Sequence, residues 1–256
     1  MKIFACQTNI VWEDKKANFK RVRQLLANTA IPPGSLIVLP EMFPTGFSMN
    51  VEATREDSPS ETEAFLRTMA REFQCFVEGG LVSAGSDGHP RNQAVVFSPQ
   101  GDLLARYSKI HPFSLGGESQ HYTAGTELVT FDWNGTSVCP FVCYDLRFPE
   151  IFRAGVQRGA QVFTVIANWP VKRIQHWVTL LQARAIENLA YVIGVNRCGT
   201  DPKYLYTGRT MVVDPHGEII AELNDEEAIL ESEILPEKVL SWRAEFPALR
   251  DMHWRP

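Results

Sequence analysis

The sequence predicts an α/β fold in which helices pack on the outside of two β-sheets. Short apolar runs of strand length alternate with segments of helical spacing, and no linker or low-complexity segment divides the chain. Residues 95–105 (VVFSPQGDLLA) and 211–221 (MVVDPHGEIIA) also share a strand, a Pro-x-Gly turn, an acid and a second strand. This similarity favours two halves with one sheet each over two unrelated hairpins. Residues 1–256 are expected to form one domain.

The first half of the chain begins with a β-leaning segment. Residues 2–10 predict a strand, and residues 15–28 place apolar side chains at helical spacing. A Pro-Pro-Gly break precedes the Leu-Ile-Val-Leu run at 36–39, which is apolar throughout and too short for a helix. This run predicts a buried strand that ends at Glu41.

Ser60 marks the start of the next predicted helix. With Glu63 three residues later it forms the sequence pattern of a capping box, so a helix is predicted over residues 60–73. Three strands are predicted after it, over residues 74–83, 93–97 and 103–110, and the last carries Lys109 near its end.

The stretch SVCPFVCYDLRFPE, residues 137–150, organises the second half. Its apolar, β-leaning run stops at Cys143, and Pro149 suits the first turn of a helix. A cysteine between a buried strand and a helix start lies near backbone N–H groups, which can lower its pKa and bind a developing oxyanion. Further along, the sequence predicts a buried strand over 162–167 that ends at Asn168, a helix over 173–189 and a strand over 191–195.

Composition narrows the class of protein. With 45% hydrophobic and 21% charged residues, the chain is expected to be globular with a large core. Its net charge is −5 and it has no basic tract, so neither nucleic acid nor an anionic membrane surface is an expected partner. No apolar run approaches a membrane span, and MKIFACQTNI is typical of a strand and not of a signal peptide. The five cysteines are scattered without paired metal spacing, which predicts free thiols in a reducing compartment such as the cytoplasm.

Polar residues follow three of the predicted buried strands. Glu41, Cys143 and Asn168 each lie just past a strand's carboxyl end, the edge at which α/β sheets bind ligands. Taken one at a time, each also has a structural explanation. Glu41 could form a salt bridge, Cys143 could pack in the core, and Asn168 could cap its strand. The residue types alone leave both interpretations open.

Three separated motifs resemble the nitrilase superfamily of carbon–nitrogen hydrolases. They are LPEMFPTGF (39–47), YSKIHPF (107–113) and CYDLRFPE (143–150), whose order matches the family's Glu–Lys–Cys triad at Glu41, Lys109 and Cys143. The resemblance covers nearly the whole chain. It implies a four-layer α-β-β-α sandwich and a cysteine-dependent amidohydrolase that needs no cofactor and no metal.

Further segments indicate a branch of that family. GGESQHYTAG (116–125) places Glu118 where the family carries a second active-site glutamate, although the interval from Lys109 is short. ANWPVKRIQHW (167–177) and GVNRCGTD (194–201) are most similar to the omega-amidase branch. That branch removes the terminal amide of 2-oxoglutaramate or 2-oxosuccinamate.

The resemblance implies a role for each site residue. Glu41 would be the base that takes the Cys143 proton, since an unactivated amide requires a thiolate nucleophile. Lys109 would hold the anionic oxygen of the tetrahedral intermediate together with the Tyr144 backbone N–H. Glu118 would orient Lys109 and assist proton transfer to the departing ammonia.

The sequence gives weaker signals for the residues that bind the part of the substrate away from the reacting amide. Arg173, shortly after Asn168, is the predicted partner of a substrate carboxylate, whereas Arg147 and Arg184 are interpreted as structural partners of nearby acids. Asn168 could donate to a substrate carbonyl or carboxylate. Aromatic residues that could line a small pocket are Phe43, Phe47, Phe113, Trp169 and Trp177.

Two alternatives to an omega-amidase stay open. One is another amide, carbamoyl or nitrile hydrolase of the same superfamily. The other is a scaffold that keeps the triad but serves to bind or sense a partner. Family resemblance also implies a homodimer that pairs through helices near the nucleophile, and the predicted helices over 148–155 and 175–190 could supply its apolar face.

Overall fold

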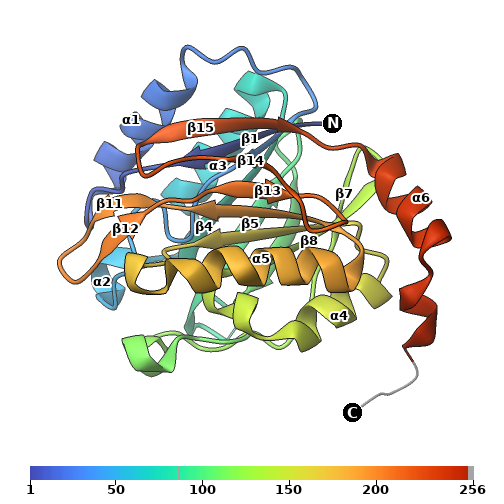
Figure 1. Cartoon of the computed structure of the whole chain (residues 1–256). Helices are drawn as coiled ribbons and strands as arrows, with labels where there is room; N and C mark the ends of the chain where they lie inside the picture. The colour runs from blue at the N-terminus through green and yellow to red at the C-terminus, as the bar shows by residue number, and fades with distance from the viewer. Residues whose placement is uncertain (86, 253–256) are drawn as a thin grey trace.

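Two β-sheets lie face to face in the middle of the fold, and helices cover the outer face of each (Figure 1). The computed structural model describes residues 1–85 and 87–252. The first sheet runs in the order β15-β1-β2-β4-β5-β6 with β3 beside β4, and the second in the order β14-β13-β10-β9-β8-β7. The stack of helices, sheet, sheet and helices confirms the predicted four-layer α-β-β-α sandwich.

The strands are short, and most are buried. Those of the first sheet are β1 (Lys2–Gln7), β2 (Leu36–Val38), β3 (Arg55–Glu56), β4 (Phe76–Ala84), β5 (Pro90–Phe97), β6 (Leu103–Ser108) and β15 (Ala228–Glu233). Those of the second sheet are β7 (Phe131–Trp133), β8 (Thr136–Val142), β9 (Val162–Ala167), β10 (Tyr191–Asn196), β13 (Met211–Val213) and β14 (Ile219–Glu222), and a separate ribbon contains β11 (Cys198–Thr200) and β12 (Leu205–Thr207).

Both sheets have the same pairing pattern. In the first, β1, β2 and β4 are parallel neighbours, with antiparallel β15 on one side and antiparallel β5 and β6 on the other. In the second, β8, β9 and β10 are parallel neighbours, flanked by β7 and by β13 and β14. The two hairpins of similar sequence, β5-β6 and β13-β14, therefore occupy equivalent edges. This confirms the prediction of two similar halves with one sheet each, except that β15, from the C-terminal part of the chain, completes the first sheet.

Helices cover both outer faces of the sheets. An apolar cluster that includes Val22, Leu66 and Met69 joins α1 and α3 to the first sheet, and α4 and α5 cover the second (Figure 1). None of the helices in the described part of the chain is both long and apolar enough to cross a bilayer. The helices are α1 (Lys15–Leu26), α2 (Val51–Thr54), α3 (Glu61–Phe73), α4 (Pro149–Gln157), α5 (Ile174–Asn188) and α6 (Pro236–Glu245).

The start of α3 matches half of the predicted capping box. The Ser60 hydroxyl accepts a hydrogen bond from the Glu63 backbone N–H at 3.0 Å, as an N-cap should. The Glu63 carboxylate does not return to Ser60; it accepts a hydrogen bond from Arg106 on β6 at 2.8 Å. An ion pair with the sheet has therefore replaced the reciprocal half of the box.

Several predicted elements are present with different ends. The first strand stops at Gln7 and not at residue 10. Gln74 adopts a left-handed conformation (φ 52°) as the C-cap of α3, so β4 begins at Phe76. β6 ends at Ser108, which places Lys109 just past the strand, although its N–H still donates to the Asn92 carbonyl at 2.9 Å.

One carboxyl group lies buried between the two sheets. Thr164 on β9 donates to Oε1 of Glu78 on β4 at 2.9 Å, and Oε2 has no hydrogen-bond partner among the described residues. Burial raises the pKa of Glu78 to about 8, although the Thr164 hydrogen bond opposes the shift. The carboxyl group is therefore largely protonated in the folded protein at neutral pH.

Glu78→Gln should stabilise the protein by an amount that grows from about pH 5 to pH 8. In the unfolded chain Glu78 ionises near its ordinary pKa of about 4.3, whereas the folded chain retains the proton until about pH 8. The wild type therefore loses roughly 3–4 kcal/mol of stability at this site between pH 5 and pH 8, and an amide loses none. Urea unfolding at pH 5 and pH 8 measures the effect, with the exposed Glu61→Gln as control. The same pH dependence in Glu78→Gln and wild type would contradict it.

Candidate active site

Segments that follow four strands meet at one end of the sandwich. Glu41 follows β2, Lys109 follows β6, Cys143 follows β8 and Asn168 follows β9. The backbone of β4 lies so close to Glu41 that a Cβ atom at Gly80 would come within 2.6 Å of the Glu41 Cα. A glycine at this position therefore allows the close approach.

Glu41 accepts hydrogen bonds on both carboxylate oxygens. Oε1 accepts from Lys109 Nζ at 2.9 Å and from Asn92 Nδ2 at 2.7 Å, and Oε2 accepts from the Asn168 backbone N–H at 2.8 Å and Nδ2 at 3.2 Å. Burial alone would raise the pKa of this carboxyl group, but the Lys109 charge and these hydrogen bonds outweigh it and hold the pKa below its usual range. Glu41 is therefore ionised in the resting site.

Lys109 lies between two buried glutamates. Its ammonium group is 2.9 Å from Glu41 Oε1 and 2.8 Å from Glu118 Oε2, and all three side chains are almost fully excluded from solvent. Burial disfavours the ammonium charge, but the two carboxylates outweigh that cost and raise the pKa of Lys109 well above its ordinary value. The ring of Phe47 also lies 5.3 Å from Nζ. Lys109 is therefore a fixed positive charge and cannot act as a base.

Glu118 reaches the cluster from the loop after β6. Two short 3₁₀ segments, η1 (Ser114–Gly116) and η2 (Glu118–Gln120), bring it back toward Lys109, and the Phe113 backbone N–H donates to its Oε2 at 2.6 Å. Burial and the nearby Glu41 charge raise the pKa of Glu118, against the opposing charge of Lys109. The short interval thus suffices to place Glu118 at the ammonium group. Of the two glutamates, Glu118 binds a proton more readily.

Cys143 opens a tight turn with an unusual backbone conformation. It begins the 3₁₀ segment η3 (Cys143–Arg147) with φ 47°, a left-handed value that a non-glycine residue rarely adopts. Buried Asp145 fixes the turn, since it accepts hydrogen bonds from the Val142 N–H at 3.2 Å and the Tyr107 hydroxyl at 2.8 Å. The Cys143 Sγ lies 4.0 Å from the Asn168 carbonyl oxygen. The thiol is therefore held against the residue that binds Glu41.

The expectation of a lowered cysteine pKa is wrong. Burial, and then the charge of Glu41, raise the pKa of the Cys143 thiol well above its ordinary value, and Lys109 only partly offsets them. The backbone N–H groups at the start of a five-residue 3₁₀ segment do not compensate for this environment. Cys143 rests as a thiol, so a thiolate forms only if a neighbouring base accepts its proton.

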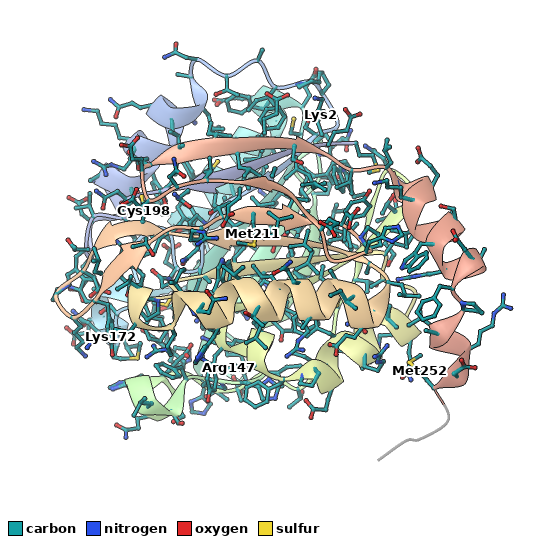
Figure 2. The ribbon with its side chains drawn as sticks, in the orientation of Figure 1. Lys2, Arg147, Lys172, Cys198, Met211 and Met252 are labelled. Carbon is teal, nitrogen blue, oxygen red and sulfur yellow. The ribbon has the colours of Figure 1, made fainter. Side chains whose placement is uncertain are left out.

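A small pocket opens onto Cys143. The cationic residues in its wall are Arg147 and Arg173, and neither has an acidic partner within 4 Å among residues 1–85 and 87–252. The Arg147 guanidinium lies 4.9 Å from the Trp169 ring and donates a hydrogen bond to His176 Nδ1 at 3.1 Å. Figure 2 shows Arg147 just below α5. The aromatic residues of the wall are Phe47, Phe113, Tyr144, Trp169, Tyr204 and Tyr206.

The structure separates the predicted pocket residues into two groups. Asn168, Arg173 and Trp169 line the pocket together with Cys143, as expected. Phe43 does not: it is buried against Phe19 and Phe65 on the outer face of the first sheet. Phe43 therefore points away from the site, and a position near the base in sequence does not imply a position near the substrate. The Asn168 side chain also donates to the Glu41 carbonyl at 2.7 Å, so its NH₂ group is not free for substrate.

Of the two arginines predicted to be structural partners of nearby acids, only one has that role. Arg184 is structural, as predicted, since it donates to the Leu146 carbonyl and pairs with Glu187 at 3.1 Å. Arg147 was assigned the same role but lines the pocket and has no acidic partner among the described residues. The nearby Glu150 is exposed and belongs to the next helix. Sequence proximity to an acid was therefore a poor guide.

Sequence reasoning missed Asn92, Tyr204 and Tyr206. Asn92 donates to both glutamates of the cluster, and the two tyrosines line the pocket from the β11-β12 ribbon. The sequence did carry a signal for Asn92. It lies two residues before Ala94 in β5, and residues two apart in a strand point to the same face, so Asn92 shares the inner face of β5 with buried Ala94. A polar residue at such a position needs buried partners. The tyrosines carry no comparable signal.

A larger cavity lies elsewhere in the molecule. It has a volume of about 730 Å³ and is bounded by the start of α3 and by β4, β5 and β6. Its arginines are already paired, Arg106 with Glu63 at 2.8 Å and Arg91 with Asp87 at 2.5 Å. We place the active site at Cys143 because the buried charges converge there and not at the larger opening.

Comparisons with known proteins agree with the geometry. The model of the carbon-nitrogen hydrolase family matches residues 2–244. Omega-amidase YafV from Yersinia enterocolitica is 39% identical over 98% of this chain and 96% of its own length, and 2-oxoglutaramate amidase from Bacillus subtilis (strain 168) is 31% identical over 85% and 84%. The crystal structure of XC1258 from Xanthomonas campestris, a CN-hydrolase superfamily protein with an arsenic adduct in the active site, is 34% identical, with a TM-score of 0.94 over 100% of this chain and 98% of that one. The chain therefore belongs to the carbon-nitrogen hydrolase family.

Proposed function

We propose that the chain is an omega-amidase, which hydrolyses the terminal amide of 2-oxoglutaramate or 2-oxosuccinamate to the 2-oxo dicarboxylate and ammonia. One observation carries the proposal. A buried Glu41–Lys109–Glu118 cluster and Cys143 adjoin a small pocket whose two arginines have no acidic partner among the described residues. A substrate with an amide at one end and a carboxylate at the other fits that arrangement. The two relatives reported above are named omega-amidase YafV and 2-oxoglutaramate amidase, which supports the same activity.

The first half of the reaction forms a thioester. Glu41 takes the Cys143 proton while Sγ bonds to the amide carbon, and the carbonyl oxygen becomes an anion held by Lys109 and the Tyr144 backbone N–H. The C–N bond then breaks, its electron pair goes to nitrogen, and nitrogen takes up the proton and leaves as ammonia. Glu118 holds Lys109 in place and supports this proton transfer. Because the thiol is protonated at rest, proton removal and attack are coupled.

The second half releases the acid. Water gives a proton to Glu41 and attacks the thioester carbon, and the same oxyanion contacts hold the second tetrahedral intermediate. The C–S bond breaks, Glu41 returns its proton to the Cys143 sulfur, and the new carboxylic acid leaves and loses its own proton to solvent to give the dicarboxylate. Each of the four hydrogen bonds on Glu41 stabilises its charge, so these hydrogen bonds weaken when Glu41 accepts a proton.

Arg147→Met and Arg173→Met should each raise the KM for 2-oxoglutaramate by about tenfold or more, with a smaller change in kcat. A charged hydrogen bond to the substrate carboxylate contributes about 1.5–3 kcal/mol, and it is made equally before and during the reaction. Steady-state kinetics measure the change, and Lys172→Met is a matched control because Lys172 is an exposed cation next to Arg173 (Figure 2). An equal loss with a simple amide that lacks a carboxylate would contradict the assignment.

The proposed function is tested by ammonia release from a panel of compounds. The panel contains 2-oxoglutaramate, glutamine, asparagine, a simple nitrile and an N-carbamoyl compound, with Cys143→Ala as control. Fast, cysteine-dependent release from the 2-oxo amide alone would support an omega-amidase. Release from another compound only would favour a different carbon–nitrogen hydrolase, and no release from any would favour a binding role.

We also propose a homodimer and a cytoplasmic location. The helices α4 and α5 lie side by side over the second sheet, and Ile186 on α5 is 52% exposed (Figure 1). Such a face suits a second copy of the chain, and light scattering coupled to size exclusion would measure its mass. All five cysteines are free and buried, which suits a reducing compartment.

A further inference from the structure

A single side-chain amide connects the two glutamates of the cluster. Asn92 Nδ2 lies 2.7 Å from Glu41 Oε1 and 2.8 Å from Glu118 Oε1. Because an amide NH₂ group carries two hydrogens, it can donate one to each carboxylate. Lys109 makes the same connection from its own side. The two Oε1 atoms are thus held by an ammonium group and by a neutral amide.

The orientation of this amide is fixed by its surroundings. Rotating the Asn92 side chain by half a turn would place Oδ1 against two carboxylate oxygens, which repel it. In the observed orientation Oδ1 is buried and has no hydrogen-bond partner in the described part of the chain. A buried acceptor left without a partner costs stability, so the side chain is retained for its donors. Asn92 is 2% exposed and does not belong to the pocket wall.

We propose that Asn92 is a positioning residue that fixes the spacing of Glu41 and Glu118 and keeps Glu41 ionised as the base for Cys143. This inference rests on the proposed role of Glu41. Asn92 suits the task because an amide donates hydrogen bonds but neither gains nor loses a proton near neutral pH. A lysine or histidine at this position would add a charge, and an aspartate would add a third acid.

The two glutamates respond differently to the same donor. Glu41 also binds both nitrogens of Asn168, and its pKa lies below the usual range, whereas Glu118 lies beside the Glu41 charge and its pKa is raised. The other titratable groups that face them are Lys109, Cys143 and Tyr122. Removing the amide should therefore raise the pKa of both carboxyl groups, and the change at Glu41 should appear in the acidic limb of the pH profile.

Asn92→Ala and Asn92→Ser test the proposal through the pH profile. Losing one hydrogen bond to a charged group should move the acidic limb of kcat/KM upward by about one pH unit. At neutral pH Glu41 stays ionised in both variants, so a fall in kcat there reports lost alignment of Glu41 and Glu118, while KM should change little because Asn92 lies outside the pocket wall. Gln93→Ala is the matched control. It removes the neighbouring buried amide, which donates a hydrogen bond to Ser108 and not to Glu41 or Glu118, so the acidic limb of kcat/KM should stay at its wild-type pH.

A second measurement separates this inference from the proposed substrate. The rate of Cys143 alkylation by iodoacetamide, followed against pH without substrate, should show the same upward shift in Asn92→Ala and Asn92→Ser. The shift together with no hydrolysis of 2-oxoglutaramate by wild type would support the inference and overturn the substrate. Normal hydrolysis by wild type with an unmoved acidic limb in both variants would overturn the role of Asn92, whatever their residual activity.

Discussion

Cys143→Ala should lower kcat for ammonia release from 2-oxoglutaramate by roughly 10⁴-fold or more. The sulfur atom forms the thioester, and loss of a nucleophile removes covalent catalysis and leaves only binding and the oxyanion contacts. Cys143→Ser should be nearly as inactive, since a hydroxyl group is harder to deprotonate than a thiol and Glu41 is held ionised by four hydrogen bonds, which makes it a weak base. Coupled detection of ammonia under single-turnover conditions measures the loss.

Substitutions at Cys143 should change the stability of the protein in a different order from its activity. The residue has φ 47°, a conformation that costs a non-glycine residue about 1–3 kcal/mol. Cys143→Gly should therefore be inactive yet at least as stable as Cys143→Ala. The matched control is Cys139→Ala, a buried cysteine in β8 that is not part of the pocket wall; it should lose stability but keep activity. Residual turnover near the wild-type rate in Cys143→Ala would remove the cysteine from the mechanism.

The sheets and the three polar residues at their strand ends were predictable from sequence for one physical reason. A short apolar run followed at once by a polar residue indicates a buried strand end, and parallel strands end at the same edge. Glu41, Cys143 and Asn168 were all found in this way, and the structure brings Asn168 into contact with Glu41. Lys109 and Glu118 depended on the family motifs, because a strand-end lysine and a loop glutamate are ordinary surface residues by themselves.

Other features depend on contacts that a local pattern does not encode. β15 pairs with β1, 221 positions or more away along the chain, and nothing in residues 228–233 indicates that partner. Phe43 and Arg147 were misplaced because the direction of a side chain in a turn follows from the turn geometry and not from its neighbours in sequence. The lowered pKa expected for Cys143 failed for a related reason: it counted the nearby N–H groups and omitted the burial and the two carboxylates.

Lys109→Met should abolish activity and also weaken the fold. Loss of the ammonium group removes an oxyanion donor worth about 10²–10³ in kcat. It also leaves Glu41 and Glu118 buried without their counter-ion, and breaking a buried pair costs about 3–5 kcal/mol. Lys2→Met is a suitable control, because Lys2 pairs with Glu231 at 3.1 Å and both side chains are exposed; it should keep activity and lose little stability.

The cost of Lys109→Met should depend on pH with a defined sign. Without the ammonium group both carboxyl groups bind protons more tightly in the folded chain than in the unfolded chain, so the variant gains stability as the pH falls and loses it as the pH rises. Urea unfolding should therefore show a larger deficit at pH 8 than at pH 5. Adding Glu118→Gln removes one of the two like charges and should recover much of the stability at pH 8 without restoring turnover. If Lys109→Met were as stable as wild type at pH 8, the glutamates would already share a proton, and Lys109 would not be the counter-ion that keeps Glu41 ready to act as a base.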